Sequence, residues 1–361
     1  MGADAFLRAI LALGVVIAAS RVSARALRSL GQPAVIGEVL SGILLGPSLL
    51  GLVSPAAESF LFPPDVQRIL GVVAQAGVLL YMFLVGLEFD WTLVRGRGAS
   101  LVAASQASIA VPFAFGCALA VAIERGYAPT GVSRFVFVLF MGVAMAITAF
   151  PVLARILTDR QLTRTPLGVA ALTCAAINDV MAWVLLAIVV GIAHAKPAGG
   201  IPGEFVIAFA VGAILPARSR FAQAVDRWLH GPVTILLLPA FFALTGLRTQ
   251  IALVSSAADW LLCLAIVAVA TAGKFGGTTL AGRAAGMSWR FAARLGALMN
   301  TRGLMELIVL TVGLEAGIIN PRLFTMMVIM AIVTTAMTGP LLSLIPAGGE
   351  DREDREEGPH A

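Results

Sequence analysis

The chain has 361 residues, of which 59% are hydrophobic and only 12% carry a charged side chain, and its mean hydropathy is +0.95. A water-soluble protein of this length needs a polar surface, and this composition is too apolar to form one. The formal net charge of +5 comes from basic residues in short segments between apolar runs, so it does not indicate a nucleic-acid-binding domain. The composition therefore predicts an all-α membrane protein with several spans.

Apolar segments long enough to cross a bilayer recur along the whole chain. A crossing needs about 20 apolar residues for about 30 Å of hydrocarbon. We predict eleven segments, at residues 5–27, 34–53, 68–89, 99–123, 134–158, 166–195, 201–216, 230–251, 258–282, 291–318 and 321–345. The seventh is short for a full crossing. Residues 1–346 are expected to form a single transmembrane domain, and the charged residues 347–361 a disordered cytoplasmic tail.

Arginine residues concentrate in alternate connections between these segments. The richer set comprises Arg21, Arg25, Arg28, Arg95, Arg97, Arg155, Arg160, Arg164, Arg218, Arg220, Arg227, Arg283, Arg290 and Arg294. Because short cytoplasmic loops carry the excess of basic residues, this bias predicts an outside N-terminus and a cytoplasmic C-terminus. Alanine-rich spans and the preference for arginine over lysine are typical of a GC-rich bacterium, so the plasma (inner) membrane is the expected location.

Two short motifs recur in the same order in the two halves of the chain. GEVLSGILLGP at 37–47 resembles GEFVIAFAVGAILP at 203–216, and LVGLEFD at 84–90 resembles LTGLRTQ at 244–250. Segments two to six, about 34–195, would then match segments seven to eleven, about 201–345. An odd number of crossings inverts the second copy in the membrane, an arrangement typical of secondary transporters with a substrate site near the midplane.

An amide and a carboxylate, Asn178 and Asp179, lie in the middle of the sixth segment, in the stretch AAINDVMAW. At 1.5 Å per residue Asp179 is about 20 Å into its helix, close to the bilayer centre. Placing an aspartate there costs about 2.5–3.5 kcal/mol, so its side chain should face the protein interior or a cavity. Asp179 is therefore a candidate ion-binding residue; the alternative is a permanently protonated structural acid, and Asn178 could equally be a helix-packing amide.

Lys274, in AGKFGG at 272–277, is the matching exception in the ninth segment. It is the sole charge between Trp260 and Arg283. A lone lysine in an apolar helix can extend its ammonium to the membrane interface. The flanking glycines favour a close helix approach instead, which would bring the ammonium against a partner such as Asp179.

Two segments are predicted to be broken. Pro151 interrupts AITAFPVLARIL at 146–157, where the carbonyl of Ile147 loses its helical donor and joins the hydroxyl of Thr148 as an oxygen ligand at membrane depth. An ordinary proline kink is the alternative. In the tenth segment, LMNTRGLMELIVL at 298–310 places polar residues in an apolar run, and two of them, Arg302 and Glu306, stand four apart and can pair. The full polar set is Asn300, Thr301, Arg302 and Glu306.

Taken together, AITAFPVLARIL, AAINDVMAW, AGKFGG and NTRGLMELIVL resemble the monovalent cation:proton antiporter 2 family, most closely its cation/H⁺ exchanger branch. LVGLEFD and LLLPAFFALTGLRT at 236–249 extend the resemblance over most of the chain. It implies an inverted-repeat fold with two crossed, discontinuous helices. It also implies that Asp179 and Asn178 bind the ion, that Lys274 is the family's membrane lysine, and that Thr148 and Pro151 lie at the crossing.

The same resemblance raises two further points. Glu88 occupies the position of an acid implicated in the exchanger branch, although on its own it reads as a solvated carboxylate at a helix end. Between His194 and Pro202 the chain has only a short loop where relatives carry two more membrane helices. The loss of two crossings keeps the later helices in the same orientation, but it puts oligomerisation and transport itself in doubt.

The function expected from these residues is exchange of one monovalent cation for one proton by alternating access. Asp179 would hold either the proton or the cation, and Asn178 in place of a second carboxylate makes the exchange electroneutral. The alternatives are a gated cation channel, or a non-transporting sensor or remnant. The expected partners are K⁺ or Na⁺, protons and the lipid bilayer, with a homodimer as a candidate assembly. No cofactor, enzymatic activity or nucleic-acid partner is expected, because no cofactor motif or nucleophile–base pair is present.

Overall fold

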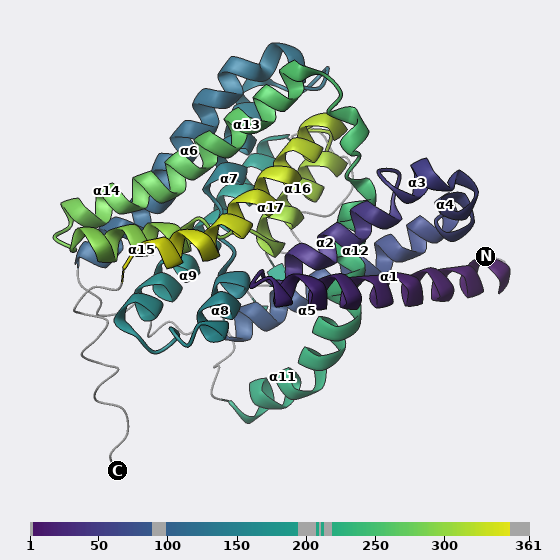
Figure 1. The fold of residues 1–361 in the computed structure, drawn as a ribbon, viewed down its shortest axis with the longest axis horizontal. Coiled ribbons are helices and arrows are strands. Elements are labelled where there is room, and N and C mark those ends of the chain that lie inside the picture. Colours follow the sequence, from purple (N-terminus) through teal and green to yellow (C-terminus); the bar gives the residue numbers. More distant parts are fainter. Residues whose placement is uncertain (1–2, 89–98, 194–206, 209–210, 213–218, 347–361) are drawn as a thin grey trace. The chain divides into compact units, whose positions relative to one another are not determined.

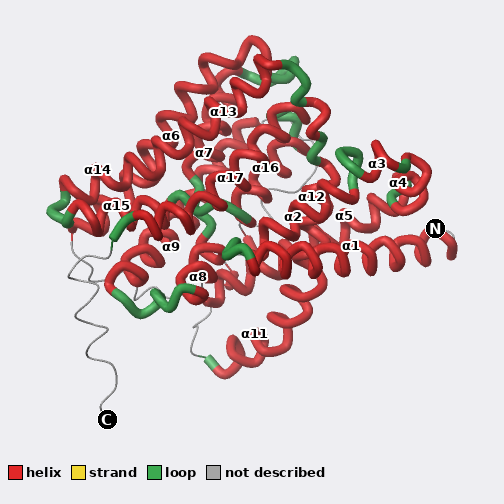
Figure 2. Tube along the Cα trace, in the orientation of Figure 1, coloured by secondary structure: helices red, strands yellow, loops and turns green. Residues whose placement is uncertain are grey.

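The computed structural model of the chain describes residues 3–88, 99–193, 207–208, 211–212 and 219–346. In these residues the chain is helical throughout, with loops and no strand (Figure 2). Nine helices are long and apolar enough to cross a membrane, and one bent pair brings the count to ten in the described part of the chain. The predicted seventh segment, 201–216, and the tail, 347–361, lie outside the described residues.

The chain divides into two compact units. Unit 1 comprises residues 1–90, 197–259 and 321–325. Its helices are α1 (Ala3–Ser29), α2 (Ala34–Leu45), α3 (Leu50–Val53), α4 (Pro55–Leu61), α5 (Pro64–Glu88), α11 (Arg220–Pro232) and α12 (Leu238–Arg248), with the π-helical turn η2 (Val233–Leu237) between the last two.

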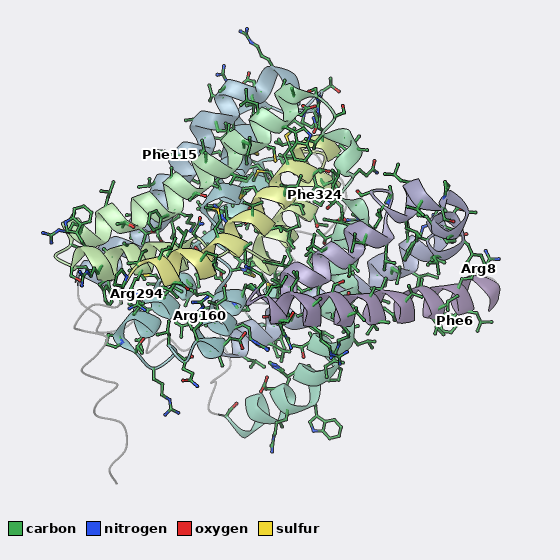
Figure 3. All side chains as sticks on the ribbon, in the orientation of Figure 1. Phe6, Arg8, Phe115, Arg160, Arg294 and Phe324 are labelled. Carbon is green, nitrogen blue, oxygen red and sulfur yellow. The ribbon has the colours of Figure 1, made fainter. Side chains whose placement is uncertain are left out.

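Packing in unit 1 depends on close backbone contact between α2 and α12. A Cβ on Gly42 would lie 2.7 Å from the Cα of Ala243, and a Cβ on Gly246 would lie 2.6 Å from the backbone nitrogen of Ile43. Real Cβ atoms do not approach so closely, so glycine is required for this crossing. On α1, Figure 3 labels Phe6 and Arg8, and Phe6 is 57% exposed. The Arg8 guanidinium lies 5.2 Å from the ring centroid of Phe60.

Unit 2 comprises residues 91–196, 260–320 and 326–361. Its helices are α6 (Ala99–Tyr127), α7 (Arg134–Ala146), α8 (Phe150–Asp159), α9 (Pro166–Ala193), most of α13 (Ala257–Thr271), the π-helical turn η4 (Ala272–Gly276), α14 (Gly277–Ala284), α15 (Trp289–Met299), α16 (Leu304–Glu315) and most of α17 (Pro321–Leu344). α6 packs against α7, α9, η4 and α14, and α7 also packs against α9 (Figure 1).

Both predicted breaks are present in unit 2. Between α7 and α8 the chain is extended, with φ −69° and ψ 142° at Ile147. Between α15 and α16 the helix axis bends by 45°, and Gly303 at the break has φ 158° and ψ −131°. The interpretation of Pro151 as an interior kink is wrong: it lies in the first turn of α8, where a missing N–H costs nothing. The helix has already ended five residues earlier, at Ala146.

Segment boundaries differ from the prediction at two places. α5 begins at Pro64 rather than at residue 68, and the span predicted at 230–251 is helical from Arg220. Both extensions are polar starts of helices, which a search for apolar residues cannot detect. The predicted segment 34–53 is not one continuous helix. It consists of α2, which ends at Leu45, and the single-turn helix α3, which begins at Leu50.

Candidate functional site

The two breaks cross each other and are joined by two hydrogen bonds. The backbone N–H of Ala149 donates to the carbonyl oxygen of Thr301 at 3.1 Å. The Thr148 hydroxyl donates to the carbonyl oxygen of Met299 at 3.2 Å. Each break leaves backbone groups without helical partners, and the crossing satisfies part of them inside the protein, as membrane depth requires.

Gly303 allows the second break to approach α8. A Cβ at this position would lie 2.6 Å from Cγ2 of Val152, and its φ is one that side chains with a Cβ rarely adopt. Residue 303 must therefore be glycine for the two interrupted helices to cross at this distance.

Thr148, Asn178 and Lys274 meet beside the crossing, together with Ser108 of α6. We call these four residues the lysine cluster. All are buried, and Lys274 has no exposed surface, so the interpretation of this lysine as one that extends to the interface is wrong. Its Nζ donates to the Thr148 hydroxyl at 2.6 Å and to the Ser108 carbonyl at 2.8 Å.

The amide of Asn178 completes the lysine cluster. Both amide atoms are satisfied when the oxygen faces Lys274 Nζ, at 3.3 Å, and the nitrogen donates to the carbonyl of Cys174, at 3.1 Å. In that orientation the oxygen also lies 2.9 Å from the Ser108 hydroxyl. The ammonium then donates its three protons to three oxygens, which is its full capacity.

Asp179 follows Asn178 in α9 and is 2% exposed. Neither of its carboxylate oxygens has a hydrogen-bond partner within the described chain. The backbone N–H of Phe150, in the first turn of α8, and the ammonium of Lys274 both interact electrostatically with the carboxylate. The ion pairs of the described residues do not include one between Asp179 and Lys274, so the expected direct contact is absent.

Arg302 lies on the second break, where it contacts the end of α7. Its Nη1 and Nη2 donate to the carbonyl oxygens of Ala144 and Met145, at 2.9 and 2.7 Å. Its Nη1 is also 3.3 Å from Oε1 of Glu306, and both side chains have no exposed surface. The predicted pair is therefore present, and the guanidinium also satisfies two orphan carbonyls at a helix C-terminus.

Threonines of α17 hold the second break from the other side. The backbone N–H of Arg302 donates to the Thr335 hydroxyl at 2.9 Å, which donates back to the Arg302 carbonyl at 2.8 Å. The hydroxyl of Thr301 donates to that of Thr338 at 3.3 Å, and Asn300 Nδ2 donates to a backbone carbonyl of α17 at 3.4 Å. The polar residues predicted in the tenth segment are thus all placed, and their partners on α17 are residues that the sequence did not single out.

Glu88 is the last residue of α5, in unit 1, and its role in the site stays a prediction. The site residues described above, by contrast, are all in unit 2.

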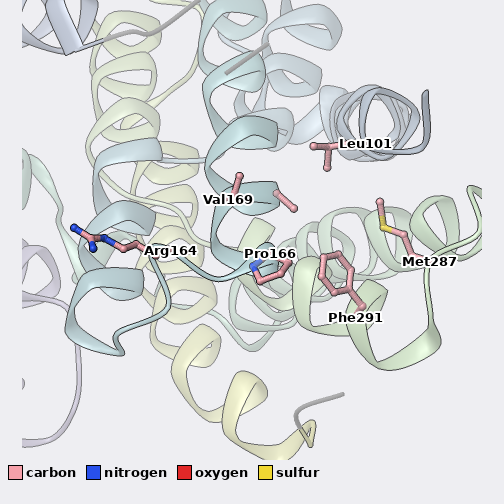
Figure 4. A pocket seen from close by; sticks show the side chains of 7 residues that line it. Leu101, Arg164, Pro166, Val169, Met287 and Phe291 are labelled. Carbon is pink, nitrogen blue, oxygen red and sulfur yellow. The ribbon is translucent and has the colours of Figure 1, made fainter. Parts of the chain in front are cut away.

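Unit 2 also has an open apolar pocket at one end of its helices (Figure 4). Its lining comprises Leu101, Arg164, Pro166, Val169, Ala170, Met287 and Phe291. The side chain of Arg164 points away from the apolar residues in Figure 4. None of the lysine cluster lines this pocket, so we place the candidate site at the crossing.

A membrane unit in which two interrupted helices cross beside a buried carboxylate has the architecture of a secondary transporter. Comparison with known proteins gives the family. The profile described as "Sodium/hydrogen exchanger, transmembrane" matches residues 12–231 and 204–346. The chain belongs to the sodium/hydrogen exchanger family.

Similar proteins share sequence over nearly the whole chain. The Na⁺/H⁺ antiporter NhaS4 of Synechocystis sp. is 38% identical, over 91% of this chain and 94% of that protein. Cation/H⁺ antiporter 17 of Arabidopsis thaliana is 35% identical over 94% of this chain, and K⁺/H⁺ antiporter 1 of Saccharomyces cerevisiae 30% identical over 87%. The chain spans only 48% and 43% of the lengths of these two proteins.

A solved structure supports the fold. The sodium proton antiporter MjNhaP1 of Methanocaldococcus jannaschii superposes with a TM-score of 0.67, over 94% of this chain and 99% of that chain. At 13% sequence identity this likeness concerns the fold alone. The predicted membership of a cation:proton antiporter family and the predicted fold class are confirmed.

Proposed function

We propose that this protein exchanges K⁺ or Na⁺ for protons across a membrane, and that Asp179 is the residue at which the two compete. The observation that supports this most directly is the state of the carboxylate: it is 2% exposed, halfway along a 28-residue helix, with both oxygens unpartnered in the described chain. A buried carboxylate without donors is stabilised either by a proton or by a cation, and one oxygen pair does not accommodate both.

The neighbouring groups leave the Asp179 carboxylate as the charged ligand for a monovalent cation. The Thr148 hydroxyl, the Asn178 amide oxygen and the Ser108 carbonyl are occupied by the Lys274 ammonium, so the cation is bound by the carboxylate oxygens and by the water it retains. Asn178 stands where a second acid would add a charge, so one cation replaces one proton and the exchange is electroneutral. The names of the similar proteins include both sodium and potassium antiporters, and we propose either ion as the substrate.

The site elements are independent of the short connection that distinguishes this chain. Residues 194–206, where the predicted loss of two helices falls, lie outside the described residues. The alignment with NhaS4 extends over 387 positions, more than the 361 residues of the chain, as an internal deletion would produce. Because α6 to α9 and α13 to α17 supply all the site groups, we propose that the shortened chain transports.

The proposal includes the orientation of the protein and the membrane that contains it, for which the distribution of arginine among the loops is the evidence. Alternate loops rich in arginine support an outside N-terminus and a cytoplasmic C-terminus in a plasma membrane. A homodimer is a candidate assembly, which light scattering of the purified protein in detergent would test.

The test is counterflow in proteoliposomes with a trapped pH-sensitive dye. Addition of K⁺ or Na⁺ outside should alkalinise the lumen, because the cation enters in exchange for protons that leave, and Asp179→Asn should abolish the signal. Asp65→Asn is the matched control, because within the described chain Asp65 makes one exposed ion pair, with Arg68. Cation flux without proton counterflow would instead identify a channel, and no flux with either ion a non-transporting protein.

A further inference from the structure

A proline in α6 provides the lysine cluster with one of its acceptors. α6 contains Pro112 in its interior. Proline has no backbone N–H, so the carbonyl four residues earlier, that of Ser108, receives no helical hydrogen bond. This carbonyl oxygen accepts from Nζ of Lys274 at 2.8 Å. Pro112 thus converts a helical carbonyl into a free acceptor facing the site.

Glycines bring the lysine to this acceptor. Lys274 lies in the π-helical turn η4, which packs against α6 (Figure 1). A Cβ on Gly273 would lie 2.9 Å from the Cα of Pro112, and a Cβ on Gly277 would lie 2.9 Å from the Cβ of Val111. The lysine backbone therefore starts beside Pro112, and its side chain reaches back about one turn of α6 to Ser108.

The result is an ammonium that is fully satisfied without the nearby acid. Its three protons go to the Ser108 carbonyl, the Thr148 hydroxyl and the Asn178 oxygen. In the described chain the oxygens of Asp179 remain unpartnered. Lys274 and Asp179 interact electrostatically, and the three hydrogen bonds of the ammonium oppose its movement toward the carboxylate.

We propose that Pro112 and Ser108 are positioning residues for Lys274: the freed carbonyl holds the ammonium on Thr148 and Asn178 and prevents it from closing onto Asp179. This inference rests on the proposed function only in taking Asp179 as the cation site. If the ammonium moved to Asp179, an incoming cation would have to displace it, and the apparent affinity for cation would fall.

Pro112→Ala tests the proposal with little risk to folding, because it removes a proline from a helix interior. The new N–H at residue 112 competes with Lys274 for the Ser108 carbonyl. The readout is the K⁺ or Na⁺ concentration that gives half-maximal thermal stabilisation of the detergent-solubilised protein. We expect it to rise about fivefold to tenfold, a fraction of the full effect of a charge-assisted hydrogen bond.

A double-mutant cycle shows whether Pro112 acts through the lysine. In a Lys274→Met background the rise should disappear, since no ammonium remains to close onto Asp179. The proposal would be overturned if Pro112→Ala raised the half-saturating cation concentration in the Lys274→Met background as well, or if it did not raise this concentration in the wild type. Pro239→Ala is the control: it removes a proline from a helix of unit 1 and should leave the half-saturating concentration unchanged in both backgrounds.

Failure of the proposed function gives a different pattern. If the wild-type protein shows no exchange in proteoliposomes and no stabilisation by either cation, the proposed function is wrong. The double-mutant cycle of Pro112→Ala and Lys274→Met is then measured from melting temperatures without cation. Pro112→Ala should then raise the melting temperature more in the Lys274→Met background than in the wild type, because only the wild type loses a lysine contact. Equal changes in the two backgrounds would overturn the positioning role.

Discussion

Arg302 donates through Nη2 to the backbone carbonyl oxygen of Met145 at 2.7 Å, from the second interrupted helix to the last turn of the first. A guanidinium that binds two successive carbonyls requires its planar fork, which lysine lacks. Arg302→Lys should lower the free energy of unfolding by about 1–3 kcal/mol, and Arg302→Met by about 3–5 kcal/mol, because Glu306 is then buried without a partner. Thermal unfolding in detergent measures both. Arg155→Met, which removes an exposed pair with Asp159, should change stability by less than about 1 kcal/mol.

Glu306 should be less important to stability than its partner. Among the described residues its carboxylate contacts Arg302 alone, at 3.3 Å, whereas Arg302 keeps its two carbonyl acceptors without Glu306. Glu306→Gln should therefore cost less than Arg302→Met. In the double variant the loss caused by Arg302→Met should shrink, since no unpaired buried charge is left. If the losses in free energy of unfolding of the two single variants simply added in the double variant, the two side chains would not stabilise each other as a buried pair.

The hydroxyl of Thr148 accepts from Lys274 and donates to the Met299 carbonyl. Thr148→Val keeps the shape and removes both bonds, so exchange in proteoliposomes should fall at least tenfold, about the effect of one charge-assisted hydrogen bond. Thr148→Ser keeps the hydroxyl and should retain most of the activity. Equal activity of the valine and serine variants would show that the hydroxyl has no part in transport.

Competition for Asp179 has a kinetic signature. When protons and cations bind the same carboxylate, each unit decrease in pH on the cation side should raise the apparent KM for the cation, by up to about tenfold where the proton dominates. The maximal rate at saturating cation should stay the same. Initial rates measured over a matrix of pH and cation concentration decide the point, because a proton bound at a separate site would lower the maximal rate instead.

Close packing in unit 1 can be tested with two glycines. Gly42→Ala places a methyl group against the backbone of Ala243, which cannot yield as a flexible side chain would. It should lower the free energy of unfolding by about 1–3 kcal/mol or more. Gly71→Ala, on α5, meets no atom within 4 Å and should be neutral or stabilising by up to about 1 kcal/mol. Similar melting temperatures for the two variants would mean that α2 and α12 separate at little cost.

The sequence was sufficient to locate the charged and amide groups of the site. Asp179 and Lys274 are exceptions in otherwise apolar helices, and such residues are expensive enough to be retained only with partners or a function. The breaks at 147–149 and 300–303 were predictable from Pro151 and from a run of polar residues. The membrane class and the helical fold follow from the same apolar periodicity.

The neutral partners were not predictable in the same way. Ser108 and Thr335 occur in apolar helices where serine and threonine commonly bond to their own backbone, so composition gives no reason to select them. One signal was available, since Pro112 follows Ser108 by four residues and must free its carbonyl. Which side chain uses that carbonyl depends on the packing of η4 against α6, which is a tertiary contact that no local pattern specifies.

Two hydrogen bonds connect the crossed breaks: Ala149 donates to Thr301, and Thr148 donates to Met299. Arg302 adds a third hydrogen bond, to the end of α7. None of the four half-helices can slide along its axis without rupturing buried contacts that no water replaces. In the proposed exchange, exposure of Asp179 first to one face of the bilayer and then to the other therefore has to move both breaks together as one rigid body.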